Sequence, residues 1–119
     1  MLVLYGISNC DTVRKARKWL EAHQVDYHFH DFRKDGLTAE QISRWTDSIG
    51  MDKLLNKRGT TWRQLPEECK EGLDTSDLQA LLLEYPALIK RPLLEGDKLC
   101  HVGFNETEYS ALMNGVSHE

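Results

Sequence analysis

Apolar and polar positions follow two different periods near the start of the chain. Residues 2–5 form a continuous apolar run, typical of a central strand covered on both faces, and Gly6 ends it. Residues 27–32 alternate aromatic and polar side chains, which predicts a half-buried strand. Between them, a helix over about residues 10–23 is predicted by apolar positions at helical spacing, Val13, Ala16 and Leu20. Strand, helix and strand in so short a segment predict a right-handed βαβ unit with a parallel strand pair.

The middle of the chain, residues 38–85, is predicted to be helical. Thr38 begins a capping-box pattern, and apolar residues follow it at helical spacing. Met51, Leu54 and Leu55 predict another short helix, and residues 60–62 can begin one more helical turn before Pro66. Ser76 begins a second capping-box pattern ahead of a longer helix. We interpret this segment as a helical insertion packed on a sheet.

The last part of the chain returns to strands. Residues 88–95 and 98–102 flank Gly96-Asp97, a dipeptide typical of a two-residue hairpin turn. Asn105, with Glu108 three residues later, predicts the start of a final helix.

The predicted order of elements is β-α-β, helical insertion, β-β-α. It indicates an α/β fold in one domain over residues 1–119: a thioredoxin-like mixed sheet with a helical insertion. The thioredoxin-like part is expected to comprise residues 1–37 and 86–116, with the insertion at residues 38–85.

Composition and charge narrow the function classes. The length suits a single domain with its own core. A net charge of −4 disfavours non-specific nucleic-acid binding, and no apolar stretch approaches the length of a membrane span. Three widely spaced cysteines do not form a disulfide framework. We therefore expect a cytoplasmic, monomeric protein in a reducing compartment that binds neither nucleic acid nor membrane.

Cys10 is the candidate for chemistry. It lies where a strand leads into a helix, close to unpaired backbone N–H groups and to four cations within the next two turns, which favours the reactive thiolate. The alternative is a buried structural cysteine. Cys69 lies among acidic residues that disfavour its thiolate, and Cys100 is predicted to be a packing residue. No metal is expected, because the pair His28 and His30 lacks a third ligand.

Several stretches resemble those of one family. Residues 5–16, with the sequence YGISNCDTVRKA, resemble the opening of the ArsC/Spx family and, within it, the YffB branch. Residues 57–59, 88–92 and 102–104 are similar to the family's other signature stretches. The resemblance covers nearly the whole chain and implies a thioredoxin fold with a helical insert. The family contains arsenate reductases, the RNA-polymerase-binding regulator Spx, and YffB proteins suggested to be glutathione-dependent thiol reductases.

The resemblance implies a set of site residues. Cys10 matches the nucleophile, and Arg91 matches an arginine that holds an anion beside it, next to a proline, Pro92, that the family pattern implies is cis. The position of another family arginine falls at Asn56, with Arg58 as a possible substitute. The remaining predicted contacts to substrate or glutathione are Asn9, Asp11 and Thr12, of which Asn9 and Asp11 have helix capping as the alternative role.

Two departures from the family pattern separate the candidate functions. A third family arginine falls at Phe104, or at His101 if the gap is placed differently, which weakens an arsenate site. The second cysteine of Spx falls at Val13, which excludes a redox switch of two cysteines at the helix start.

The sequence therefore predicts a glutathione-dependent thiol reductase that uses one N-terminal cysteine. No bound cofactor is expected; glutathione is the co-substrate, and the substrate is a small-molecule or protein thiol or disulfide. The alternatives are an arsenate reductase linked to glutathione or glutaredoxin, and a protein-binding regulator of the Spx type without catalysis.

Overall fold

The computed structural model describes residues 2–97 and 99–117, with side chains as far as residue 113 in the final helix. Its chain divides into two compact units, Met1–Asp31 with Arg91–Glu119, and Phe32–Lys90. The second unit begins before the predicted boundary at residue 38, because the Phe32 ring packs on Trp45 with ring centroids 6.1 Å apart. It also extends past residue 85, since the Lys90 N–H donates to the Leu54 carbonyl at 2.8 Å.

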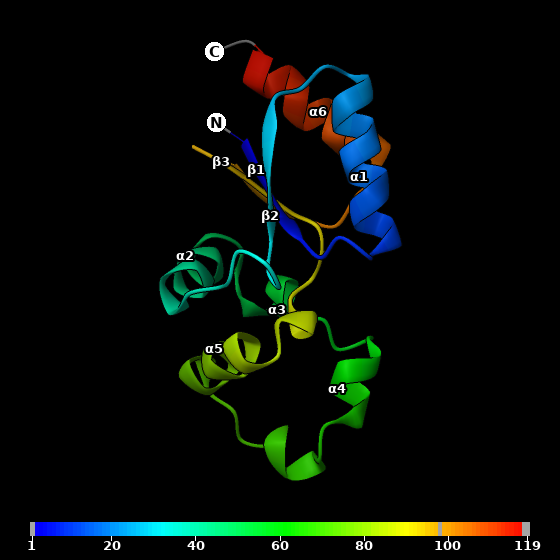
Figure 1. The fold of residues 1–119 in the computed structure, drawn as a ribbon. Helices are drawn as coiled ribbons and strands as arrows, with labels where there is room; N and C mark the ends of the chain where they lie inside the picture. The colour runs from blue at the N-terminus through cyan, green and yellow to red at the C-terminus, as the bar shows by residue number, and fades with distance from the viewer. Residues whose placement is uncertain (1, 98, 118–119) are drawn as a thin grey trace. The chain divides into compact units, whose positions relative to one another are not determined.

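The first unit is built on a four-stranded mixed sheet in the order β2-β1-β3-β4 (Figure 1). Its strands are β1 (Leu2–Gly6), β2 (Tyr27–Asp31), β3 (Leu93–Gly96) and β4 (Leu99–Val102). β1 is parallel to β2 and antiparallel to β3, which in turn is antiparallel to β4. This confirms the predicted parallel pair and the thioredoxin-like connectivity.

Two helices, α1 (Asp11–Ala22) and α6 (Glu106–Ser117), lie side by side on one face of this sheet (Figure 1). The core beneath them comprises six buried residues, Leu4, Ala16, Trp19, Leu20, Leu94 and Tyr109. α1 forms where the helical spacing predicted it, and its buried positions include Val13, Ala16 and Leu20. At the start of α6, the Asn105 side chain accepts a hydrogen bond from the Glu108 N–H at 3.1 Å, so the predicted cap is confirmed.

The hairpin differs from its prediction in two respects. Residues 86–88 form a 3₁₀ turn, η2, and β3 begins only at Leu93, because Ile89 pairs with Leu55 inside the second unit. Gly96 pairs with Leu99, so the predicted turn at Gly96-Asp97 is wrong by one residue. Residue 98, the predicted first residue of the second hairpin strand, lies outside the described residues.

The second unit is helical, as the sequence predicts for most of it. Its elements are α2 (Ala39–Ile49), α3 (Met51–Leu54), α4 (Thr60–Gln64), the 3₁₀ turn η1 (Glu67–Cys69), α5 (Thr75–Glu84) and η2 (Pro86–Leu88). Thr38 and Gln41 form the predicted capping box. The second box is formed by Asp74 and Asp77, so the predicted start at Ser76 is wrong: Asp74 accepts the N–H of Asp77 at 2.8 Å.

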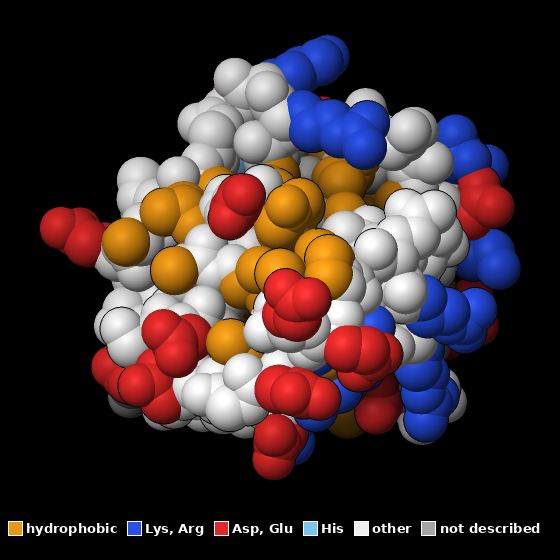
Figure 2. Space-filling view, turned by 90° about the horizontal axis from the view of Figure 1, so that it is seen from below, with side chains coloured by type: hydrophobic (Ala, Val, Ile, Leu, Met, Phe, Trp, Pro, Cys, Tyr) orange, Lys and Arg blue, Asp and Glu red, His pale blue; other side chains and the backbone are white. Residues whose placement is uncertain are grey.

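Side chains on one face of the molecule are shown in Figure 2, where hydrophobic groups reach the surface beside acidic ones. Among the described residues, the exposed large hydrophobic side chains are Leu83 and Tyr85, at the end of α5 and directly after it. No described helix combines the length and the apolar character that crossing a membrane requires.

Candidate active site

The end of β1 and the beginning of β3 meet at one edge of the sheet. Tyr5 lies opposite Leu93, and the antiparallel register carries Arg91 and Pro92 toward the segment that follows Gly6. The Arg91–Pro92 peptide bond is cis, as the resemblance implied. The Gly103 N–H donates to the Pro92 carbonyl at 2.8 Å, which ties this segment to the end of β4.

Cys10 occupies the N-cap position of α1, with extended backbone angles of φ −92° and ψ 126°. Its N–H donates to the Ile7 carbonyl at 3.2 Å, which closes a turn between β1 and the helix. Its carbonyl accepts the Arg14 N–H at 3.0 Å, the first bond of the helical ladder. The half-buried sulfur therefore lies at the positive end of α1, as the sequence predicts.

Opposing influences act on the Cys10 thiol, and those that favour the thiolate prevail. Desolvation by burial is the largest single influence and raises the pKa of Cys10. The Val13 N–H, the Arg91 side chain and the Thr12 N–H lower this pKa by hydrogen bonding, and the charge of Arg91 lowers it further. The net result is a Cys10 pKa below that of an ordinary cysteine.

Of the predicted contacts, the Thr12 N–H and the Arg91 side chain lie against the sulfur. Asn9 and Asp11 are exposed, and neither is the cap of α1, because Cys10 holds that position. The capping role considered for them is therefore wrong. Asp11 instead forms an ion pair with Arg14 one turn later. A contact of Asn9 or Asp11 with substrate stays a prediction.

Arg58 belongs to the second unit, as does Asn56 at the family's arginine position. The Asn56 Oδ1 accepts the Arg58 N–H at 3.1 Å, and the Arg58 side chain is exposed. Next to it, the Lys57 ammonium lies 5.7 Å from the centre of the Trp62 ring. The role of Arg58 in anion binding stays a prediction.

The two candidates for the third family arginine pack against α6. The Phe104 ring meets the Tyr109 ring edge to face, with centroids 4.8 Å apart. His101 lies 5.9 Å from the same ring, and its Nε2 is 3.3 Å from a carboxylate oxygen of Glu108. Neither position supplies a guanidinium, whereas Arg91 supplies one beside Cys10.

Sequence reasoning assigned Val13 to the core and missed its second role. Its side chain is buried, yet its N–H faces the Cys10 sulfur. The signal was present in the chain, because an N-cap side chain contacts the N–H groups two and three residues later. A cysteine at the N-cap therefore points to Thr12 and Val13 together.

Cys100 lies in β4, far from Cys10 at the start of α1. It is opposite Glu95, which is opposite Val3 near the beginning of β1, whereas Cys10 follows the end of β1. Two strand spacings place Cys100 about 10 Å to the side of β1, and the offset along β1 adds about 10 Å more. Bridged cysteines have Cα atoms within about 7 Å, so these two cannot pair without movement of the backbone. No group of potential ligands in the described part of the chain is arranged to hold a metal ion.

Comparison with known proteins places this geometry in a family. The model of the ArsC family matches residues 5–112. A solved structure named YffB is 44% identical, with a TM-score of 0.89, over 93% of this chain and 97% of its own. A Brucella melitensis structure described as an arsenate reductase (ArsC) related protein is 45% identical, with a TM-score of 0.76, over 94% of this chain and 93% of its own.

Two further similarities concern the regulators and the fold. The global transcriptional regulator Spx of Bacillus subtilis is 32% identical over 111 residues, covering 91% of this chain and 83% of its own. A glutaredoxin structure from Archaeoglobus fulgidus, at 15% identity and a TM-score of 0.52, shows the shared thioredoxin-like fold alone.

Proposed function

This chain belongs to the ArsC family, and from that premise we propose that it is a glutathione-dependent thiol oxidoreductase with Cys10 as its nucleophile. The observation that carries the proposal is the position of the Cys10 sulfur at the N-terminus of α1. There the N–H groups of Thr12 and Val13 and the Arg91 side chain lower its pKa despite partial burial. A cysteine with these neighbours is a thiolate over a wider pH range than a free one, and the thiolate is the attacking species.

The proposed reaction proceeds by successive thiol–disulfide exchanges. The Cys10 thiolate attacks one sulfur of the substrate disulfide; a bond forms between the two sulfurs, and the other substrate sulfur leaves as a thiolate. A glutathione thiolate then attacks the Cys10 sulfur and releases the second substrate thiolate. A second glutathione attacks the mixed disulfide, which releases oxidised glutathione and restores Cys10. The substrate gains two electrons, and two glutathione molecules lose one each.

An external resolving thiol suits this site. Cys100 is too far from Cys10 to resolve a mixed disulfide in the same unit, and Val13 stands where Spx has its second cysteine. Glutathione brings a thiol together with two carboxylates. Arg91 and the N–H groups at the start of α1 are suitable partners for one of them.

Three variants test the proposal. A Cys69→Ser/Cys100→Ser double variant is expected to keep glutathione-dependent reduction of a model disulfide, and Cys10→Ser is expected to abolish it. Mass spectrometry after mild oxidation with glutathione should show one glutathione on Cys10. Loss of activity in the double variant, together with a Cys10–Cys100 disulfide in the oxidised wild type, would overturn the proposal.

The same proteins separate the alternatives. Arsenate reduction by the wild type, without disulfide reduction, would assign the arsenate reductase function instead. Formation of the glutathione adduct without turnover of either substrate would favour a regulator of the Spx type.

A further inference from the structure

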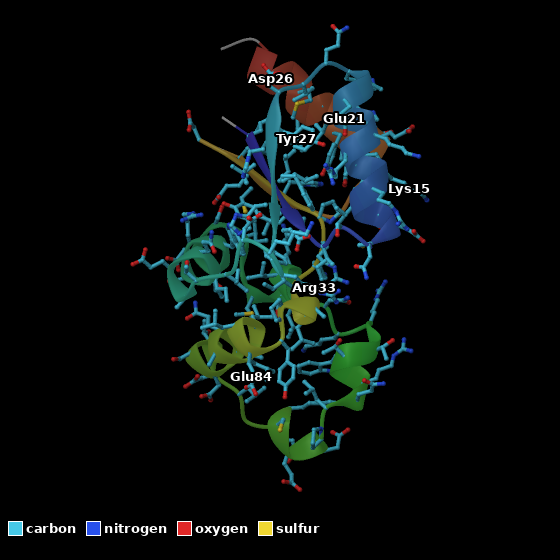
Figure 3. All side chains as sticks on the ribbon, in the orientation of Figure 1. Lys15, Glu21, Asp26, Tyr27, Arg33 and Glu84 are labelled. Carbon is cyan, nitrogen blue, oxygen red and sulfur yellow. The ribbon has the colours of Figure 1, made fainter. Side chains whose placement is uncertain are left out.

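α1 presents unpaired positive charge on its outer face. Of its four basic residues, Arg17 faces the sheet: its guanidinium lies 4.2 Å from the centre of the Phe29 ring and donates to the Tyr27 hydroxyl at 3.2 Å. Arg14 is paired with Asp11. Lys15 and Lys18 are both exposed, and in the described part of the chain neither has an ion-pair or hydrogen-bond partner. Figure 3 shows Lys15 on the side of α1 that faces away from the sheet.

The stability of the helix does not account for these lysines. Cations stabilise a helix near its C-terminus, yet α1 has no basic residue in its last turn. Lys15 and Lys18 are one turn apart on the same face, and Lys18 is four residues from Arg14, so like charges repel one another along this face. The helix has two carboxylates at pairing distance in sequence from these lysines, but both have other partners. Asp11 pairs with Arg14, and the Glu21 carboxylate accepts a hydrogen bond from the Tyr27 hydroxyl at 2.9 Å. Neither ammonium group is buried, so neither contributes to the core.

We propose that this outer face of α1, carrying Lys15 and Lys18, is a docking surface for an acidic segment of a protein disulfide substrate. The inference rests on the proposed function, because it assigns the substrate class of the same cysteine. The acidic segment is expected to flank the cysteine whose disulfide Cys10 attacks, in the exchange step described above.

The spacing along the helix suits a polypeptide. Lys15 and Lys18 follow Cys10 by five and eight residues, which places them about 7 and 12 Å along the axis at 1.5 Å per residue. Extended chain advances about 3.3 Å per residue, so carboxylates two to four residues from the attacked cysteine span that distance. The protein as a whole carries a net charge of −4, so a local cationic face would select which acidic chains approach Cys10.

The test measures rates of exchange at Cys10 in the full chain carrying Cys69→Ser/Cys100→Ser. The probes are three peptides of equal length, each with one cysteine as its disulfide with mercaptoethanol, flanked by aspartates, serines or lysines. At about 0.01 M ionic strength the aspartate peptide is expected to react about tenfold faster than the serine peptide. At about 1 M, where the Debye length is about 3 Å, the two rates should converge.

Charge reversal locates the effect. Lys15→Glu/Lys18→Glu should remove the preference for the aspartate peptide, and Lys15→Arg/Lys18→Arg should keep it. Lys34→Glu/Lys53→Glu, which changes two exposed lysines of the second unit and gives the same net charge, should also keep it. The ratio of aspartate to serine rates is the readout, because a change in the Cys10 thiolate itself affects both peptides alike.

Two results would overturn the inference: no preference for the aspartate peptide in the parent protein, or an equal loss of preference in both Lys→Glu double variants. Failure of the proposed function gives a different result. In that case the peptides would react with Cys10 with the expected preference, but glutathione would not restore the free thiol.

Discussion

Arg91 is the residue whose removal most directly tests the electrostatics of Cys10. It acts on the sulfur by a side-chain hydrogen bond and by its charge, and both lower the pKa of Cys10 against the opposing effect of burial. We therefore expect Arg91→Ala to raise the pKa of Cys10.

The magnitude follows from the type of contact. A charge-assisted hydrogen bond contributes about 1.5–3 kcal/mol, and about 1.36 kcal/mol corresponds to one pKa unit, which sets an upper range of roughly 1–2 units. Cys10 is only half-buried, so solvent screens part of this interaction. We therefore expect Arg91→Ala to raise the pKa of Cys10 by about one unit.

The assay is the pH dependence of alkylation at Cys10 in the Cys69→Ser/Cys100→Ser background. Arg91→Ala should move the midpoint of the rate profile to higher pH. At the alkaline plateau the variant should react about threefold faster, because a more basic thiolate is a stronger nucleophile. The two profiles should therefore cross, and a circular dichroism spectrum like that of the wild type should show that the variant is folded.

Matched variants complete this experiment. Arg91→Lys keeps the positive charge but loses the planar guanidinium group with its several donors. The midpoint of its alkylation profile should therefore lie between those of the wild type and Arg91→Ala. Arg63→Ala removes an exposed arginine of α4 and should leave the profile unchanged. A folded Arg91→Ala protein with the wild-type midpoint would refute the reasoning.

Three further predictions concern stability, measured by urea unfolding. A Cβ on Gly6 would lie 2.7 Å from a Val13 methyl carbon, so Gly6→Ala should lower the free energy of unfolding by about 1–3 kcal/mol. In a protein that already carries Val13→Ala, the same change at Gly6 should cost less. The buried Tyr109 hydroxyl has no hydrogen-bond partner among the described residues, and burial raises its pKa. Stability should therefore fall as pH rises above about 10, where only the unfolded tyrosine ionises, and Tyr109→Phe should reduce that loss without destabilising the protein at neutral pH. Asp74→Ala should cost about 1 kcal/mol and Ser76→Ala much less, because Asp74 is the cap of α5; equal losses would contradict this assignment.

Much of the first unit could be predicted because the spacing of its apolar residues along the sequence is unambiguous. The apolar run of β1 and the spacing of Val13, Ala16 and Leu20 in α1 leave one arrangement of strand and helix, which the structure confirms. The errors fall where several residues compete for one local role. Asp74 and Ser76 can both cap a helix, and the choice depends on which carboxylate or hydroxyl meets an N–H three residues later. The strand-like residues before Arg91 were misassigned because Ile89 pairs with Leu55, a contact remote in sequence.

For the site, the residues near Cys10 in sequence determine one half of its chemistry. A strand that ends at Gly6 and a helix that starts at Asp11 place the sulfur at the helix N-terminus, and this depends only on local backbone preferences. The other half depends on the sheet. Arg91 is 81 residues from Cys10 in the chain, and it reaches the sulfur because Tyr5 pairs with Leu93 in antiparallel register. Strand register is set by long-range burial and pairing, which no local pattern specifies, so without the resemblance to a family only the tertiary structure could bring that arginine to the thiol.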